Sequence, residues 1–244
     1  MKKQMINRII LYIAGLLILA LGLTLNTKAG LGVSPIISVS FSISEIAGWN
    51  FGNTTMGLYS VFVVAENILH CIRQRQYEKK SDKALQHANK VDRKLILFMD
   101  IMQILLSIVF TRFLNIFSSV IPDIQSVVSS EKAEMAVRFI VLVAALVLTG
   151  IGAAMSLNMR IVPNPGDGIV QAISDCIHKS VGFTKNCFDI FNVTVTVIIS
   201  LIFTGQLHGV GIGTVLAVIG VGRTIALFNH LARADMIKLA GIEE

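Results

Sequence analysis

The stretch Arg8-Ile-Ile-Leu-Tyr-Ile-Ala14 is followed 130 residues later by the similar stretch Arg138-Phe-Ile-Val-Leu-Val-Ala144. Further residues align at this offset and, from Phe51 onward, at an offset of 132: Gly22 with Gly152, Asn26 with Ser156, Pro35 with Pro165, Phe51 with Phe183, and Tyr59 with Phe191. An internal repeat of this kind defines the structural unit of a fold. We therefore predict that the chain contains two copies of one unit.

Both copies are strongly hydrophobic. The chain of 244 residues is 54% hydrophobic and 15% charged, with a mean hydropathy of +0.72, whereas soluble domains carry about 25% charged residues. A helix needs about 20 apolar residues to cross the hydrocarbon core of a bilayer. Six apolar blocks approach or reach this length: 9–26, 54–72, 95–117, 139–157, 188–204 and 209–229. We predict six transmembrane helices, the first of them retained, since its repeat partner is internal and cannot be a signal peptide.

Two shorter apolar stretches, 34–48 and 164–179, follow the first span of each copy. The distribution of Lys and Arg tests whether they cross, because these residues concentrate in cytoplasmic loops. If neither stretch crosses and the N-terminus is inside, 17 basic residues lie inside and 4 outside. If both cross, the counts become 11 and 10. The strong bias favours six spans, with both short stretches returning to the side from which they entered as re-entrant helices.

The predicted fold class is an all-α integral membrane protein with two inverted three-helix repeats, each with a short re-entrant helix after its first span. Three crossings per copy is an odd number, so the second copy is upside down relative to the first. The expected organisation is a first repeat at 1–72 with re-entrant segment 34–48, a basic cytosolic linker at 73–94, the third span at 95–117, an external loop at 118–135, and a second repeat at 136–244 with re-entrant segment 164–179. Inverted repeats with interrupted helices are typical of transporters.

Each short stretch begins with a helix-start signal, Ser34-Pro35 in the first and Asn164-Pro165 in the second. Ser and Asn cap free N–H groups, and proline fits the first helical position. Asp167 falls at the third position, where a carboxylate meets the positive end of the helix. These features describe ordinary well-capped helices, but with the predicted topology the two N-termini also meet near the bilayer midplane and form a polar or anion-receptive site. Neighbouring glycines are expected to permit tight turns: Gly30, Gly32, Gly166 and Gly168.

Acidic residues within the spans form a second candidate group. Glu66 lies about six residues before the linker, and Asp100 lies about six residues after it. With a helical rise of about 1.5 Å per residue, both side chains are expected about 9 Å below the same surface of the membrane. They can form a proton- or cation-handling pair, or can be interfacial acids that pair with an arginine. Arg223 in the last span is expected to neutralise Asp167, Asp189 or Glu66, or to bind an anionic substrate. The full set of candidate substrate- or ion-binding residues is Ser34, Pro35, Glu66, Asp100, Asn158, Asn164, Pro165, Asp167 and Arg223.

The sequence contains no recognisable catalytic motif. The histidines at 70, 178, 208 and 230 share no metal-ligand spacing, and the three cysteines share no metal or redox spacing. Nucleophile-elbow, P-loop, zinc-protease and dinucleotide-binding patterns are also absent. We therefore predict that the protein is not an enzyme and uses no cofactor and no metal. The net charge of +6 lies in loops, where membrane orientation requires it, and does not indicate a nucleic-acid partner.

Four short motifs carry a family resemblance: Ala29-Gly-Leu-Gly-Val-Ser-Pro35, Gly48-Trp-Asn-Phe-Gly52, Pro165-Gly-Asp-Gly168 and Gly209-Val-Gly-Ile-Gly-Thr214. As a set they resemble the YczE/YyaS/YitT family of bacterial integral membrane proteins, over nearly the whole chain except 73–135. That family usually has Trp-Asp after the first proline, whereas this chain has Ile36-Ile37, so the acid exists only in the second copy, at Asp167. The resemblance implies a bacterial inner-membrane protein with an inferred transport role and no defined substrate.

Three functions are consistent with these features: a small-solute or ion transporter working by alternating access, a channel of aquaporin-like design, and a non-transporting membrane assembly or substrate-capture subunit. In the aquaporin design the half-helix follows the second span of each half, whereas here it follows the first, which favours the transporter. The expected location is the bacterial plasma (inner) membrane, with multiple spans and both termini cytoplasmic. The expected partners are the lipid bilayer and a small solute or ion, with no nucleic acid; a homo-oligomer is compatible with the sequence.

Overall fold

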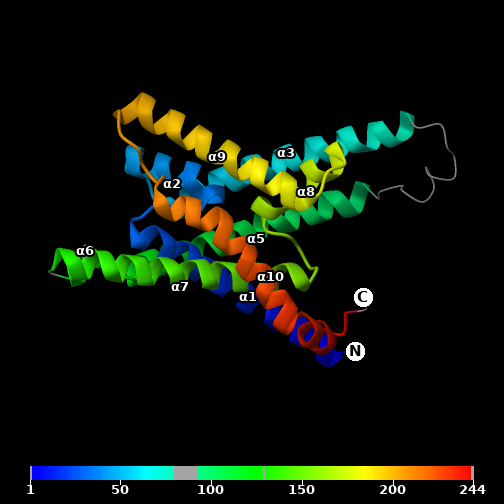
Figure 1. The fold of residues 1–244 in the computed structure, drawn as a ribbon. Coiled ribbons are helices and arrows are strands. Elements are labelled where there is room, and N and C mark those ends of the chain that lie inside the picture. The colour runs from blue at the N-terminus through cyan, green and yellow to red at the C-terminus, as the bar shows by residue number, and fades with distance from the viewer. Residues whose placement is uncertain (1, 80–92, 129, 243–244) are drawn as a thin grey trace.

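The computed structural model describes residues 2–79, 93–128 and 130–242, and the regular elements within these ranges are all helices (Figure 1). They are α1 (Lys2–Ala29), α2 (Pro35–Ala47), α3 (Phe51–Lys79), α5 (Arg93–Val120), α6 (Ile124–Val127), α7 (Glu131–Asn158), α8 (Pro165–Ile177), α9 (Val181–Thr204) and α10 (Ile212–Ala240). The predicted all-α class is therefore confirmed for the described part of the chain.

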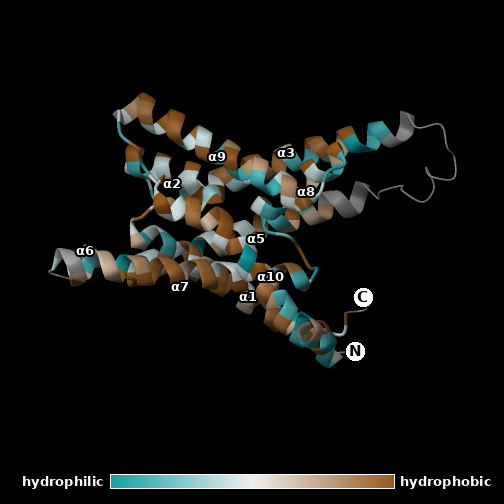
Figure 2. Cartoon of the chain, viewed as in Figure 1, coloured by the Kyte–Doolittle hydropathy of each residue, from teal (hydrophilic) through white to brown (hydrophobic). Residues whose placement is uncertain are grey.

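Six of these helices are long and apolar enough to cross a membrane: Lys3–Ala29, Phe51–Gln76, Phe98–Val120, Ala133–Asn158, Val181–Thr204 and Ile212–Ala240. Each contains most of one predicted apolar block, so the expectation of six apolar membrane helices is confirmed. Figure 2 shows hydrophobic residues along these helices and hydrophilic residues toward the two chain ends. Large apolar side chains such as Ile202 and Phe203 of α9 are mostly exposed. Lipid covers such surfaces in a multi-pass membrane protein.

The pair formed by α1 and α7 is the most extensive helix contact in the structure. Small residues permit it, because a Cβ atom added to Gly22 of α1 would lie 2.5 Å from the backbone nitrogen of Thr149. A Cβ atom added to Gly15 would lie 2.8 Å from the nitrogen of Ser156. As the α1 residue number rises, the α7 number falls, so the two helices are antiparallel. Close backbone approach through small residues is the usual basis of helix association within a membrane.

The two ends of the α1–α7 pair are held by matching arginine contacts. Arg8 at the start of α1 donates from Nε to the Met159 carbonyl oxygen at 2.7 Å. Arg138 near the start of α7 donates from Nη1 to the Ala29 carbonyl oxygen at 3.0 Å. The last carbonyl groups of a helix lack partners within the helix, and a basic side chain satisfies them. The two donors, Arg8 and Arg138, are 130 residues apart in the sequence, and so are the two acceptors, Ala29 and Met159. This separation equals the spacing of the sequence repeat.

The helices α2 and α8 have 13 residues each, or about 20 Å, and are too short to cross a hydrocarbon core of about 30 Å. Their bounds differ by one or two residues from the predicted segments 34–48 and 164–179. Each short helix packs mainly against the second long helix of the other half, α2 against α9 and α8 against α3. Figure 1 shows α2 and α8 displaced from each other along the bundle.

Two local predictions about the short helices are wrong. The side chain of Asn164 caps α8 by accepting a hydrogen bond from Gly166 N at 3.1 Å, but the Ser34 side chain makes no cap hydrogen bond and lines a cavity instead. Gly30 and Gly32 do form the turn before α2, with φ of 66° and 110°. Gly166 and Gly168 lie inside α8 without positive φ. These two permit close contacts with other helices rather than a turn.

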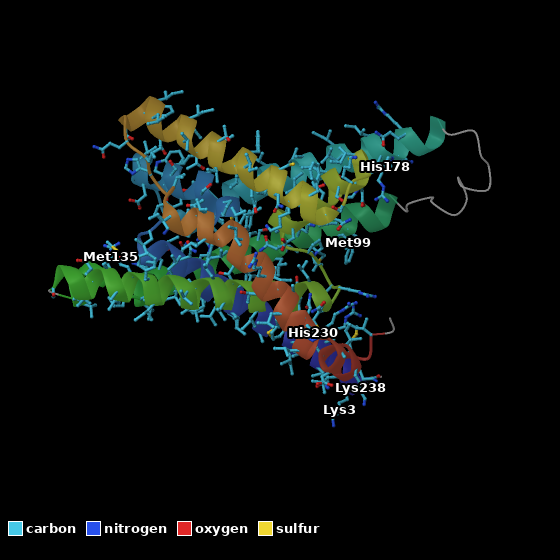
Figure 3. The ribbon with its side chains drawn as sticks, viewed as in Figure 1. Lys3, Met99, Met135, His178, His230 and Lys238 are labelled. Carbon is cyan, nitrogen blue, oxygen red and sulfur yellow. The ribbon has the colours of Figure 1, made fainter. Side chains whose placement is uncertain are left out.

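Helices extend into both predicted connecting segments. The helix α3 continues to Lys79 and α5 begins at Arg93, so helical ends occupy both margins of the 73–94 segment, and residues 80–92 lie outside the described part. The 118–135 segment contains the short helix α6 and the first turn of α7. Both chain ends lie at one end of the bundle, where Asn7 Nδ2 donates to the Leu239 carbonyl and Figure 3 places Lys3 near Lys238.

Candidate functional site

A small cavity lies where the N-termini of α2 and α8 approach the α1–α7 pair. Its volume is about 50 Å³, which is enough for a few water molecules or a small ion. Its polar lining comes from α3, α7, α9 and the starts of both short helices: Ser34, Tyr59, Thr149, Asn164, Asp167 and Lys185. Its apolar lining includes Leu19, Leu23, Ile36, Ala153, Val221 and Ile225. We call this space the central cavity.

The starts of the two short helices are in direct contact at the central cavity. A Cβ atom added to Gly166 would lie 2.8 Å from Ile36 Cγ1, so the absence of a side chain at Gly166 lets the first turn of α8 reach the first turn of α2. Asp167 places a carboxylate in the first turn of α8, where the helix dipole favours negative charge. The first turn of α2 has no acidic residue. The two helix ends therefore differ in charge.

The cation of the central cavity is Lys185, near the start of α9. Its Nζ atom lies 3.6 Å from Asp189 Oδ2, and its side chain also lines the cavity beside Asp167. Asp189 is buried, and its Oδ1 atom has no hydrogen-bond partner. Lys185 thus pairs with Asp189 and lines the same cavity as Asp167.

Other polar side chains lie at the central cavity or elsewhere in the buried core. The Asn164 side chain interacts with the hydroxyl group of Tyr59. Thr149 Oγ1 is buried at the cavity without a hydrogen-bond partner. Asn26 of α1 is also buried, and neither of its side-chain polar atoms has a partner. A buried polar atom without a partner costs about 1–3 kcal/mol, and such atoms mark places where water or a ligand supplies the missing hydrogen bond.

A second polar group lies between α3 and α5, and none of its residues lines the central cavity. The structure brings Glu66 and Asp100 together there, with His70 and Gln103. Gln103 Nε2 donates to Glu66 Oε1 at 3.3 Å. Among the described residues neither acid forms an ion pair with a lysine or arginine, whereas nearby Arg73 pairs with Asp175 of α8 at 2.6 Å. In Figure 3, Met99, the neighbour of Asp100 in sequence, lies on the same side of the bundle as His178, whereas Met135 lies on the other side.

The remaining predicted residues lie at separate places. Asn158 Nδ2 donates to Asn229 Oδ1 at 2.7 Å and joins α7 to α10. Pro35 and Pro165 are the buried first residues of their helices. Arg223 is exposed on α10, and no ion pair between it and an acid occurs in the described ranges. The expected neutralisation of an acid by Arg223 is therefore not observed, because this side of α10 faces away from the cavity that Lys185 lines.

Sequence reasoning missed five contributors: Tyr59, Thr149 and Lys185 at the central cavity, and His70 and Gln103 beside the acids. A signal was present for three of them. Lys185 and Asp189 are four residues apart, as are Glu66 and His70, and Asp100 and Gln103 are three apart. Residues at these spacings share one face of a helix. No comparable signal identifies Tyr59, whose position depends on how α3 packs against α8.

Residues 6–230 match the model of a family of unknown function, DUF6198, so the chain belongs to that family. No curated protein and no solved structure matches the chain. The family match does not name the YczE/YyaS/YitT family, and that resemblance stays a prediction.

Proposed function

We propose that this member of DUF6198 is a small-solute or ion transporter in which two inverted repeats move around the central cavity. The observation that carries the proposal is the contact of α2 and α8, two short helices from different halves of the chain, at a small polar space. In many transporters, discontinuous helices meet at the repeat interface and place their N-termini at the substrate. The central cavity is the corresponding place in this chain.

The pattern of helix contacts supports the inverted relation of the two halves. The α1–α7 pair is antiparallel, and its arginine contacts repeat at an interval of 130 residues. Ser38 contacts Thr196, and Ser42 contacts Ser200, at the same sequence separation of 158, so α2 runs parallel to α9. By the same test α8 runs parallel to α3, because Arg73 contacts Asp175 and Glu66 approaches Gly168 at a separation of 102. An inverted repeat with re-entrant α2 and α8 accounts for these relations together.

The distribution of charge supports a specific orientation. With six spans and the termini inside, 17 of the basic residues lie on the side of the termini and 4 on the other. We propose that the termini, the linker and the C-terminal end of α8 face the cytoplasm of a bacterial cell, and that α6 and the C-terminal end of α9 face outward. The re-entrant helix α2 then enters from outside and α8 from inside.

The size and charge of the central cavity favour a small, polar substrate. A volume of about 50 Å³ holds an ion or a solute of a few atoms. Asp167 and Lys185 supply one charge of each sign, and Tyr59 and Asn164 supply neutral hydrogen-bonding groups. A small polar space between two repeats fits a carrier better than a wide continuous pore, so the aquaporin-like channel is the second candidate.

Transport is tested with purified protein in liposomes and a panel of protons, alkali cations, halides and small polar solutes. We expect saturable flux of at least one of them. Asp167→Asn and Lys185→Met, which change the charge of the cavity, should each lower that flux at least tenfold. Asp235→Asn, an acid-to-amide change at an exposed site on α10, should leave it unchanged. Flux that does not saturate would identify a channel. A folded protein that moves none of the panel, or acts only with a stoichiometric partner, would overturn the transporter.

Topology is tested by single-cysteine labelling in a background without the three native cysteines. Cysteines at Gly48 and Asn50 should react only with a reagent added from outside the cell, because they follow the C-terminal end of α2. A cysteine at Lys179, after α8, should react only from the cytoplasmic side. Labelling of both regions from the same side would contradict two opposed re-entrant helices, whatever the outcome of the flux measurement.

A further inference from the structure

The group of ionisable side chains between α3 and α5 has the composition of a metal site. One ligand atom from each of Glu66, His70 and Asp100 can be chosen so that all three lie within 4.8 Å of one another. His70 Nε2 lies 3.5 Å from Glu66 Oε1. Two ligands bonded at about 2.1 Å to one tetrahedral ion lie about 3.4 Å apart. The Glu66–His70 separation is therefore already suitable for a shared ion.

Unpaired buried oxygen atoms give a second, independent indication of a ligand. Glu66, Asp100 and Gln103 are only 5%, 3% and 1% exposed. Glu66 Oε2, Asp100 Oδ2 and Gln103 Oε1 have no hydrogen-bond partner in the structure. Gln103 is neutral, and its amide group contacts Glu66 Oε1 through Nε2. Because the oxygen and nitrogen of an amide can be exchanged by a simple flip, this side chain can also offer its oxygen to a cation.

Among the side chains that the structure describes, no lysine or arginine forms an ion pair with Glu66 or Asp100. In the described part of the chain, the only basic group within ion-pair distance of Glu66 is His70, and Arg73 is paired with Asp175. The neighbouring residue of α8 is Gly168, where an added Cβ atom would lie 2.5 Å from Glu66 Oε2. Two adjacent buried carboxylates are costly unless a cation or protons compensate them. A bound cation compensates both at once.

We infer that Glu66, His70 and Asp100, assisted by Gln103, bind a divalent transition-metal ion such as Zn²⁺, Mn²⁺ or Co²⁺. An imidazole nitrogen with carboxylate and amide oxygens suits these ions, whereas alkali and alkaline-earth cations prefer oxygen ligands alone. The His70 side chain is 21% exposed, so the site is not fully enclosed by protein. None of its residues lines the central cavity, so metal binding is measurable whether or not the chain transports a solute.

Binding is tested on the full chain, purified in detergent and stripped of metal with a chelator. We expect titration with Co²⁺ to give visible absorption bands that saturate at one ion per chain, and Zn²⁺ to compete for the same site. Glu66→Gln, His70→Gln and Asp100→Asn should each weaken Co²⁺ binding at least tenfold. His178→Asn, which changes a histidine at the left-handed C-cap of α8 outside the cluster, should bind like the original chain.

Gln103→Glu provides a second test if the other variants fail to fold. It adds a third carboxylate to the site and should therefore tighten Co²⁺ binding. Each variant is first checked for a single elution peak in size-exclusion chromatography. Absence of saturable binding by the original chain at millimolar Co²⁺, or equal binding by the original chain and all three ligand variants, would overturn the metal site. An original chain that binds no Co²⁺, but takes up more protons on acid titration than Glu66→Gln does, would overturn the metal site in favour of a proton-binding pair. None of these readouts requires transport.

Discussion

The contact of α2 with α9 and the contact of α8 with α3 occupy corresponding places in the proposed repeats, yet they use different side chains. Between α2 and α9, hydroxyl groups pair: Ser38 Oγ with Thr196 Oγ1 at 2.7 Å, and Ser42 Oγ with Ser200 Oγ at 2.8 Å. Between α8 and α3, the contacts are the Arg73–Asp175 ion pair, the approach of Gly168 to Glu66, and a hydrogen bond from Cys176 Sγ to the Leu69 carbonyl.

This difference indicates that the two short helices have different roles. Neutral hydroxyl pairs hold α2 in a way that does not depend on pH, ions or substrate charge. The ionisable groups gather around α8, which carries Asp167 at its start, lies against Glu66 and ends beside Arg73. We therefore expect α8 to respond to ligands and α2 to serve as its fixed counterpart.

The largest effect is expected when the close approach of α8 to Glu66 is blocked. Gly168→Leu would force side-chain atoms against Glu66 and Gln103, since even a Cβ atom there lies 2.5 Å from Glu66 Oε2. We expect a loss of about 1–3 kcal/mol in unfolding free energy, together with weaker Co²⁺ binding. Unfolding in detergent, followed by circular dichroism, measures the first effect. Gly57→Leu on α3 is the control, because a Cβ atom there meets nothing within 4 Å; equal stability of the two variants would contradict the close packing.

A smaller effect is expected from the ion pair that joins α8 to α3. In a double-mutant cycle of Arg73→Gln and Asp175→Asn, the coupling energy should be about 1 kcal/mol, because both side chains are partly buried. The Lys28–Asp123 pair provides the comparison: its acid is 75% exposed, so its coupling should be lower. Stronger coupling at the exposed pair would show that solvent screening does not set the strength of these contacts.

The smallest effect is expected at the hydroxyl pairs of α2. A cycle of Ser42→Ala and Ser200→Ala should give a coupling of about 0.6 kcal/mol, which is typical of hydrogen bonds between membrane helices. Ser60→Ala is a suitable control, since the exposed Ser60 hydroxyl donates only to the Met56 carbonyl of its own helix. If the Ser42–Ser200 coupling depended on metal or substrate, α2 would not be the fixed element that we propose.

The fold was largely predictable because its signals are local. Six apolar blocks of near-spanning length produced the six long helices, and the Ser-Pro and Asn-Pro dipeptides marked the starts of α2 and α8 correctly. The cap at Ser34 was not predictable in the same way. The two dipeptides have similar propensities, and only the packing of Ser34 against the central cavity separates its outcome from that of Asn164.

The candidate sites were less predictable because they depend on helix rotation and on contacts between distant segments. Glu66 and Asp100 were expected at similar depth, but depth alone does not say whether α3 and α5 turn these side chains toward each other. The spacing between histidines did not indicate His70, because its neighbours at the site are acids and not other histidines. Arg223 and Lys185 are both basic residues near cavity-lining helices, and only tertiary packing decides that Lys185 lines the central cavity while Arg223 is exposed.

The matching contacts of Arg8 and Arg138 have a consequence for how the protein is made. Each arginine donates to a carbonyl group at the end of the other helix, so the α1–α7 pair cannot close until α7 has been synthesised. At typical rates of translation, the 130 residues that separate the two arginines take on the order of 10 s to appear. We expect α1 to lack its main partner during that interval. Assembly of the core is then a late event in biogenesis, timed by the arrival of α7.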